Sequence, residues 1–371
     1  MPAEFRDITV FIIDPRVLIR QMLSRVMREE TDVSSLIALE NKQNDETLIE
    51  IENHNPDLIL LGIESIQSKE FWLLKSIINM YPGIPVVLLT TLTPQGARAA
   101  LTGLKLGAVE YLTVPDTSQG VVFAGRHFRK RLTPLIKALP NLNMRANLGN
   151  QIVISQTSSV ATQKKLKQKE DIELVVIGGC LGGVQTLYDV ISRMSEISVP
   201  VMILQHMPKI YTRELAADLD EITPLNVREA EENSILLPGQ VYVAPGGYHT
   251  VLKSNWRRNM INIHRGPREI KYRPSIDVLL RSAVNVYQNR VMGVFLSGGG
   301  KDGVDGAKEV LEAGGEILVQ SKKSSRLWDL PGSIQSLHVS INQYHSHQLG
   351  EEIISRLKDR MSTATHSKMV N

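Results

Sequence analysis

The sequence is poor in cysteine, in net charge and in long apolar runs, and each absence excludes a class of protein. One cysteine, Cys180, in 371 residues excludes a framework of internal disulfides and fits a reducing, cytoplasmic environment. A formal net charge of +3, without a dense Lys/Arg block beside an aromatic surface, gives no electrostatic support for nucleic-acid binding. No apolar run approaches the roughly 18 residues of a membrane span, so no membrane insertion is expected.

The composition that remains is that of a globular protein. Hydrophobic residues make up 42% and charged residues 22% of a chain long enough for two domains, each with its own core. The first residues, MPAEFRDITVFIID, are charged and then enter a short apolar run that ends in Asp14. We interpret this run as a first strand, because no signal-peptide cleavage pattern follows it.

Short apolar runs alternate with amphipathic stretches along the first third of the chain. Strands are predicted at Ile8–Ile13, Leu58–Leu61, Pro85–Leu89 and Glu110–Thr113. Helices are predicted at Val17–Glu29, Glu70–Met80 and Gly96–Leu106. Strands that alternate with helices favour right-handed crossovers and a parallel, doubly wound sheet.

A second alternating pattern begins after Asp171. Strands are predicted at Glu173–Ile177, Val199–Leu204, Val241–Val243, Val291–Leu296 and Ile317–Val319. Helices are predicted at Gly183–Met194 and Ile276–Tyr287, and a further helix is expected to end at Gly314–Gly315. Ser275 is a suitable N-cap for the helix at Ile276, and Asp277 in its first turn favours the helix dipole.

Four motifs in the first half resemble a two-component receiver domain. They are IIDPRVLIRQML, PDLILLGIES, PVVLLTTLT and GAVEYLTVPD, in the order and spacing of receiver strands. Receivers need several carboxylates at one sheet edge, one to accept phosphate and the others to hold Mg²⁺. By this resemblance Gly62 stands at the phosphoacceptor position, Pro15 at the second acidic position and Val114 at the lysine position, while Asp14 and Thr90 are kept. We therefore expect a receiver fold without a phosphorylation switch.

Three glycine-rich or polar loops in the second half each follow a predicted strand. They are IGGCLGG at 177–183, LQHMP at 204–208 and LSGGGKDG at 296–303. With LPGQVYVAPGGYH and YRPSIDVLL, this ordered set resembles the chemotaxis protein-glutamate methylesterases (the CheB family) over about 190 residues. In an open α/β sheet, loops at the carboxyl ends of strands converge on one crevice.

The resemblance implies a catalytic role for three residues in these loops. Cys180 stands where the family has its nucleophilic serine, on a tight strand-to-helix turn whose amides can stabilise an oxyanion. His206 then corresponds to the general base, and Asp302 would orient it. The resemblance implies no cofactor and no metal.

The cysteine leaves two interpretations open. Free cysteine packs as a small hydrophobe, so Cys180 could occupy a turn that has lost its chemistry, and Leu181 and Gly299 also depart from the family's Thr and Met. Alternatively, a thiol at a helix N-terminus beside a histidine has a lowered pKa and is a competent nucleophile. The retention of His206 and Asp302 slightly favours the second interpretation.

Two other kinds of site are disfavoured by spacing. The glycine-rich runs do not fit G-x-x-x-x-G-K-[ST], because Lys301 is followed by Asp302. Zinc is not indicated, because His249 and His264 lack companions at ligand spacing, and the late histidines are irregularly spaced.

The predicted fold class is α/β, with two doubly wound parallel-sheet domains joined by a linker. The first is receiver-like and of flavodoxin type, and the second is a Rossmann-like methylesterase domain. The expected boundaries are 5–130 for the receiver-like domain, 131–170 for the linker, 171–361 for the methylesterase domain and 362–371 for a disordered tail.

The resemblance implies a cytoplasmic hydrolase that removes methyl esters, and deamidates some glutamines, on cytoplasmic helices of methyl-accepting chemoreceptors. The resemblance leaves open whether a chemotaxis kinase is a further partner. The alternative is a catalytically inactive adaptor that binds receptors or signalling partners.

Overall fold

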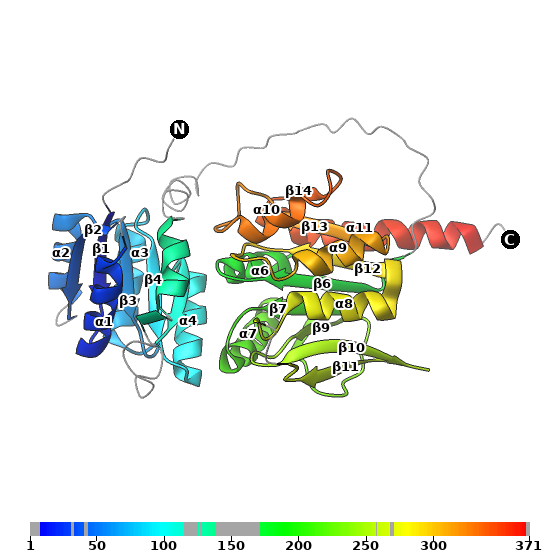
Figure 1. Ribbon diagram of the computed structural model, residues 1–371, viewed down its shortest axis with the longest axis horizontal. Helices are drawn as coiled ribbons and strands as arrows, with labels where there is room; N and C mark the ends of the chain where they lie inside the picture. Colours follow the sequence, from blue (N-terminus) through cyan, green and yellow to red (C-terminus); the bar gives the residue numbers. More distant parts are fainter. Residues whose placement is uncertain are drawn as a thin grey trace.

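The computed structural model describes two α/β lobes side by side (Figure 1). It describes residues 8–30, 33–40, 44–114, 125–126, 128–137, 171–256, 258–267 and 271–368. Of the linker expected at 131–170, residues 138–170 lie outside the described residues. Within the described part of the chain, no helix is both long and apolar enough to cross a membrane.

The first lobe is built on a five-stranded parallel sheet in the order β2-β1-β3-β4-β5. The strands are β1 (Ile8–Ile13), β2 (Val33–Leu39), β3 (Leu58–Gly62), β4 (Val86–Thr90) and β5 (Glu110–Thr113). The helices are α1 (Val17–Arg28), α2 (Asn44–His54), α3 (Lys69–Met80) and α4 (Pro94–Leu106). This is the doubly wound, flavodoxin-type order, and it confirms the predicted fold class.

The two faces of this sheet follow from alternation along its strands. Phe11 and Ile13 of β1 pack in one apolar cluster with α2, α3 and α4. Val10 and Ile12 point to the other face and pack with α1 and with helical residues 128–137. The first lobe therefore extends past the boundary expected at 130, because helical residues 128–137 pack on its sheet. The buried apolar residues of this segment, such as Leu132, need the sheet as a partner.

The second lobe contains a seven-stranded parallel sheet in the order β14-β13-β12-β6-β7-β9-β8 and an antiparallel hairpin, β10-β11. The strands are β6 (Leu174–Gly179), β7 (Val201–Gln205), β8 (Asn226–Glu229), β9 (Gln240–Val243), β10 (His249–Asn255), β11 (Arg258–His264), β12 (Val291–Phe295), β13 (Glu316–Gln320) and β14 (Asn342–Tyr344). The hairpin lies beside α8 rather than in the parallel sheet (Figure 1).

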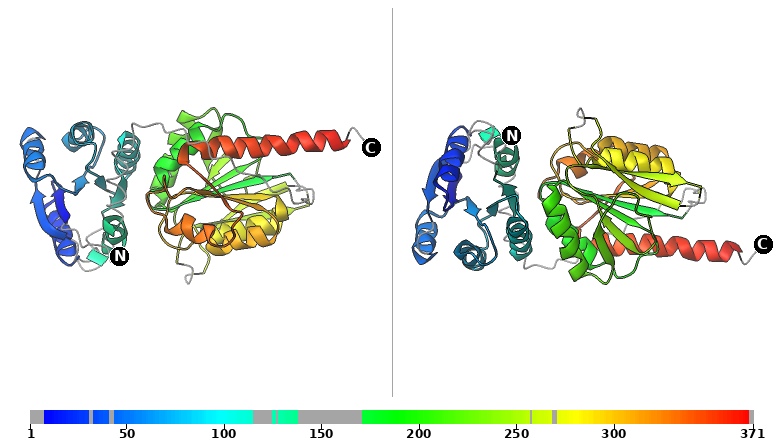
Figure 2. Two further views of the ribbon diagram at one scale, coloured as in Figure 1. Left: turned by 90° about the horizontal axis from the view of Figure 1, so that it is seen from above. Right: turned by 90° about the horizontal axis from the view of Figure 1, so that it is seen from below.

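Helices cover both faces of the second sheet (Figure 2). They are α6 (Gly183–Ser192), α7 (Lys209–Ile222), α8 (Ile276–Tyr287), α9 (Val304–Glu312), α10 (Asp329–Gln335) and α11 (Ser346–Lys368), with a 3-10 turn η2 (Gln288–Arg290). Val175 and Ile177 of β6 pack with α6, α7 and α11, whereas Leu174 and Val176 pack with α8, α9 and α10. Helix α11 runs to Lys368, past the tail boundary expected at 361.

The lobes are packed together as well as joined by the chain. Helix α4 of the first lobe lies against α7 and α6 of the second, and one apolar cluster runs through all three helices. Gln185 of α6 donates hydrogen bonds to two carbonyl oxygens at the end of α4, those of Leu104 at 2.5 Å and Ala108 at 2.8 Å. The first lobe therefore borders the end of the second sheet where β6 meets α6.

Candidate active site

Three neighbouring strands of the second sheet deliver the residues of the candidate site. Cys180 follows β6 directly, His206 follows β7 directly, and Asp302 lies in the loop between β12 and α9. Because β12, β6 and β7 are adjacent and parallel, their carboxyl ends share one edge. The order of connections reverses at β6, and crevices in doubly wound sheets open at such a point.

Glycines allow the loops to close tightly around Cys180. Gly182, the N-cap of α6, has φ +76°, a left-handed conformation that glycine adopts without strain. A Cβ on Gly298, in the third loop, would lie 2.8 Å from Cβ of Cys180. Gln205 fixes the turn from the β7 side, because its Nε2 donates to the carbonyl oxygen of Cys180 at 2.7 Å. The cysteine is thereby held at 7% exposure.

Asp302 is held by hydrogen bonds at the N-terminus of α8. Its carboxylate accepts from Oγ of Ser275 at 2.6 Å and from the backbone N–H of Ile276 at 2.7 Å. Its Oδ2 also lies 2.8 Å from Nε2 of His206. Burial alone would raise the pKa of Asp302, but the hydrogen bonds from His206, Ser275 and Ile276 outweigh burial and lower it. Asp302 is thus an anion that fixes the His206 ring.

Cys180 and His206 shift each other's pKa in opposite directions. Burial opposes ionisation of the thiol, but the neighbouring His206 outweighs burial and lowers the pKa of Cys180. Burial likewise opposes protonation of His206, yet the hydrogen bond with Asp302 and the neighbouring Cys180 raise its pKa to about 9. Both shifts favour the charge-separated form of the pair, a thiolate beside an imidazolium.

The hydrogen-bond geometry between Cys180 and His206 is less well formed than their pKa shifts suggest. Nε2 of His206 is committed to Asp302, which leaves Nδ1 to serve as a base. Nδ1 is buried and makes no well-formed hydrogen bond to a described residue. We take the contact with Cys180 as close but not yet directed for proton transfer, which is common in unliganded sites.

Tyr272 and His249 join the site without having been predicted to do so. The Tyr272 ring stacks on His206, with centroids 5.0 Å apart and planes 10° apart. His249 is fully buried, and its strand partner across the hairpin is His264, with ring centroids 5.7 Å apart. Both residues lie in motifs that carried the family resemblance, and that was the available signal. Among the described residues, no group of three or more His, Cys, Asp or Glu could hold a metal ion.

In the first lobe, an ion pair fills the position where a receiver would hold its metal. The Asp14 carboxylate is fully buried and is bound by Nε and Nη2 of Arg16, at 2.8 and 2.6 Å. A Cβ on Gly62 would lie 2.2 Å from Oδ2 of Asp14. Thr90 and Val114 end β4 and follow β5 at the same edge, as predicted. The pocket therefore lacks an acceptor and also has no room for one.

The first lobe contacts the turn that carries Cys180. Oε2 of Glu110 accepts a hydrogen bond from the backbone N–H of Gly182 at 2.6 Å. Leu181, where the family has threonine, packs against the apolar cluster of α1 and residues 128–137, together with Leu327. This departure from the family pattern thus joins the turn to the first lobe.

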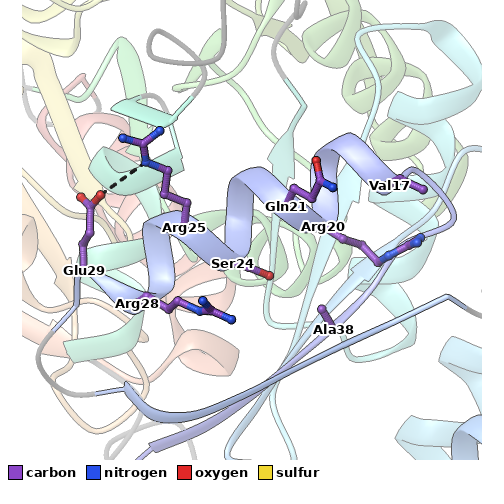
Figure 3. Close-up of a pocket in the computed structure, with 8 residues that line it drawn as sticks. All are labelled: Val17, Arg20, Gln21, Ser24, Arg25, Arg28, Glu29 and Ala38. Carbon is purple, nitrogen blue, oxygen red and sulfur yellow. Dashed lines mark ion pairs between the residues drawn. The ribbon is translucent and has the colours of Figure 1, made fainter.

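A surface hollow of about 670 Å³ lies elsewhere, on the first lobe between α1 and β2 (Figure 3). Residues of α1 line it, including Arg20, Arg25 and Arg28, with Ala38 from β2. Arg25 is paired with Glu29 at its rim. None of the three loop residues borders this hollow, so it is separate from the candidate active site.

Comparison with known proteins agrees with the geometry. The sequence model of the CheB methylesterase family matches residues 175–353. A protein-glutamate methylesterase/protein-glutamine glutaminase of Trichodesmium erythraeum is 31% identical over 350 residues, which are 94% of this chain and 98% of that protein. The chain belongs to this family.

Another CheB relative is similar along the same length, and two solved CheB domains each match part of the chain. A protein of the same name from Caulobacter vibrioides is 32% identical over 352 residues, 94% of this chain and 99% of the relative. Among solved structures, the Thermotoga maritima CheB catalytic domain is 30% identical and covers 50% of this chain and 98% of its own, with a TM-score of 0.48. The response regulator domain of the same CheB is 25% identical and covers 37% and 98%, with a TM-score of 0.31. The relatives carry the names of hydrolases, which agrees with the expectation that this chain is a hydrolase.

Proposed function

We propose that the chain hydrolyses γ-methyl esters of glutamate side chains in chemoreceptors through Cys180, His206 and Asp302. The observation that carries the proposal is the Asp302 carboxylate, whose Oδ2 lies 2.8 Å from Nε2 of His206, beside a Cys180 thiol whose pKa His206 lowers. A site that had lost its chemistry would have no reason to keep a buried carboxylate on the far nitrogen of this ring.

The proposed reaction proceeds through an acyl-enzyme. The Cys180 thiolate attacks the ester carbonyl carbon, and amides at the N-terminus of α6 stabilise the oxyanion. The bond to the methoxy oxygen breaks, and His206 gives its proton to the departing methanol. Neutral His206 then takes a proton from water, which attacks the thioester. The C–S bond breaks, and the glutamate carboxyl and the thiolate are released.

The same residues support deamidation of glutamine, with ammonia as the leaving group in place of methanol. The name of the relatives includes protein-glutamine glutaminase, which supports this second reaction. A thiolate leaves more readily than methoxide, so protonation by His206 decides whether the first intermediate goes forward. We therefore expect slower ester turnover than from a serine at position 180.

The test is methanol release from methylated receptor membranes by the wild type, Cys180→Ala and Cys180→Ser. Cys180→Ala should abolish release, and Cys180→Ser should retain or raise it, because the base and the turn amides stay in place. No release from any of the three proteins would refute the proposal and favour the non-catalytic adaptor. The hydrolase names of the relatives lend the adaptor no support.

A further inference from the structure

Four cations lie in the segments around His206. Lys209 begins α7, Arg265 follows β11, and Lys271 and Arg273 lie just before α8; we call these four residues the cationic rim. Lys209, Arg265 and Lys271 are exposed, and Arg273 is half-buried.

Contacts between aromatic rings and cations make the rim continuous with the catalytic histidine. Nζ of Lys271 lies 5.3 Å from the centre of the Tyr272 ring, which stacks on His206. Arg273 donates to the carbonyl oxygen of Pro267 at 2.9 Å, which ties this segment to the end of β11.

The other half of the rim meets at Tyr248. Nζ of Lys209 lies 5.2 Å from the centre of the Tyr248 ring, and Cζ of Arg265 lies 5.6 Å from it. A backbone hydrogen bond connects the segment of Tyr248 to Arg273: the N–H of Gly247 donates to the carbonyl oxygen of Arg273 at 3.2 Å. The four cations thus belong to one surface around the site.

No carboxylate of a described residue forms an ion pair with the rim, in contrast to several other cations of the lobe. None of its four residues forms an ion pair with a described residue. Elsewhere in the same lobe, Arg281, Arg290 and Arg356 are each paired with a glutamate. Four clustered cations without an ion pair to a described residue create a positive potential that attracts negative charge.

Two titratable groups on this surface respond to that potential. The hydrogen bond from Arg265 and the charges of Lys209 and Arg265 lower the pKa of Tyr248. Burial lowers the pKa of His249, and the charges of His264 and Arg273 lower it further. Asp302 is the one carboxylate that acts against these charges at His249.

Buried polar atoms of the same surface also lack protein partners. Nε of Arg273 and both ring nitrogens of His249 are buried and make no hydrogen bond to a described residue. Buried polar atoms in folded proteins are nearly always hydrogen-bonded, so an exception indicates a bound ion, an ordered water or a functional role.

We propose that the cationic rim binds acidic residues of the polypeptide that flank the glutamate undergoing hydrolysis. The inference rests on the proposed function. If the scissile ester binds at Cys180, the substrate polypeptide on either side of it passes over the rim. Complementary charge speeds encounter and fixes register, so it acts on the capture of substrate more than on bond breaking. The substrate class is thus an acidic segment of protein, and a neutral segment is a poorer substrate.

The test uses two synthetic helical peptides with one glutamate γ-methyl ester each. In one, glutamates flank the ester; in the other, glutamines replace them. Methanol release gives kcat/KM for both peptides with the full-length wild type and the Lys209→Gln/Arg265→Gln variant. We expect the wild type to prefer the acidic peptide by about 10-fold, and the variant to lose that preference.

Salt and a matched control separate the rim from general charge effects. The preference of the wild type should shrink as ionic strength rises, because added salt screens exposed charges beyond about 10 Å at 0.1 M. Lys253→Gln is the control, since Lys253 is an exposed, unpaired lysine on β10 outside the rim. It should keep the wild-type preference. Equal use of both peptides by the wild type, or an undiminished preference in the double variant, would overturn the proposal.

Binding keeps the proposal testable if the proposed chemistry fails. Fluorescence anisotropy of the two labelled peptides with the Cys180→Ala protein gives their Kd values without turnover. A Kd about 10-fold lower for the acidic peptide, lost on adding Lys209→Gln/Arg265→Gln, supports the rim even if no methanol is released. Equal Kd values contradict it even if the enzyme is active.

Discussion

The hydroxyl of Tyr211, in α7, lies 2.6 Å from Oγ1 of Thr90, at the end of β4. Tyr211 also donates to the carbonyl oxygen of Thr91 at 2.9 Å and stacks on Tyr111, with ring centroids 4.8 Å apart. Thr90 is the hydroxyl retained at the receiver's phosphate-binding position. In this chain it is engaged by Tyr211 of the second lobe, so the two lobes are joined where a receiver would bind phosphate.

The first prediction concerns phosphorylation of the first lobe. Incubation with acetyl phosphate and Mg²⁺ should leave the intact mass of the protein unchanged, because Arg16 occupies the Asp14 carboxylate and Gly62 offers no acceptor. An added phosphoryl group within residues 8–114 would contradict this prediction.

Restoring an acidic residue at position 62 should not restore the switch. Gly62→Asp places a side chain against Asp14, whose Oδ2 would lie 2.2 Å from the new Cβ, and should destabilise the protein by roughly 1–3 kcal/mol. Gly83→Asp is the control, because nothing lies within 4 Å of a Cβ at that position. Urea unfolding compares the two variants. Equal stability would show that the pocket has more room than we infer.

The second prediction concerns the pH dependence of Cys180 alkylation by iodoacetamide. Because the pKa of Cys180 is lowered, the reactive thiolate persists below the pH at which an ordinary thiol is protonated, and the rate falls only as pH drops below the lowered pKa. His206→Gln removes the group that lowers this pKa, so its rate profile should move to higher pH. Identical profiles for wild type and variant would refute the ion pair.

The third prediction concerns Leu181, which packs against the first lobe. Leu181→Thr, which installs the family residue, removes apolar contact with the cluster of α1 and residues 128–137, a loss of about 1–3 kcal/mol. Weaker docking of the first lobe should raise the alkylation rate of Cys180, which is only 7% exposed. Leu237→Thr, at an exposed leucine of the same lobe, is the control and should leave the rate unchanged. An unaltered rate in Leu181→Thr would mean that the first lobe does not restrict access.

The fourth prediction separates the two roles of Ser275. This serine caps α8, accepting from the backbone N–H of Val278, and donates to Asp302 at 2.6 Å. Ser275→Ala should cost about 1 kcal/mol of stability and lower kcat about 10-fold, because Asp302 then holds His206 less firmly. Ser68→Ala removes a comparable cap from α3, far from the site, and should cost similar stability without changing kcat. Equal losses of kcat would assign the effect to stability alone.

The sequence by itself determined much of the fold. Strands buried on both faces, such as Ile8–Ile13 and Val291–Phe295, are continuous apolar runs, and their periodicity is local information. Strand β2, with its mixed burial, and the hairpin β10-β11 were missed, because half-exposed strands carry no such run. The three loops of the candidate site were predicted correctly as loops at strand ends.

Only the tertiary structure decided which side chains meet. Strand β12 lies next to β6 although five strands separate them in the sequence, and this order brings Asp302 to His206. The Asp14–Arg16 pair, the contact of Tyr211 with Thr90 and the cationic rim likewise join residues whose spacing shows no motif. The physical reason is that periodicity reports which face of an element is buried, whereas strand order and lobe packing are settled by how all the apolar faces are covered together.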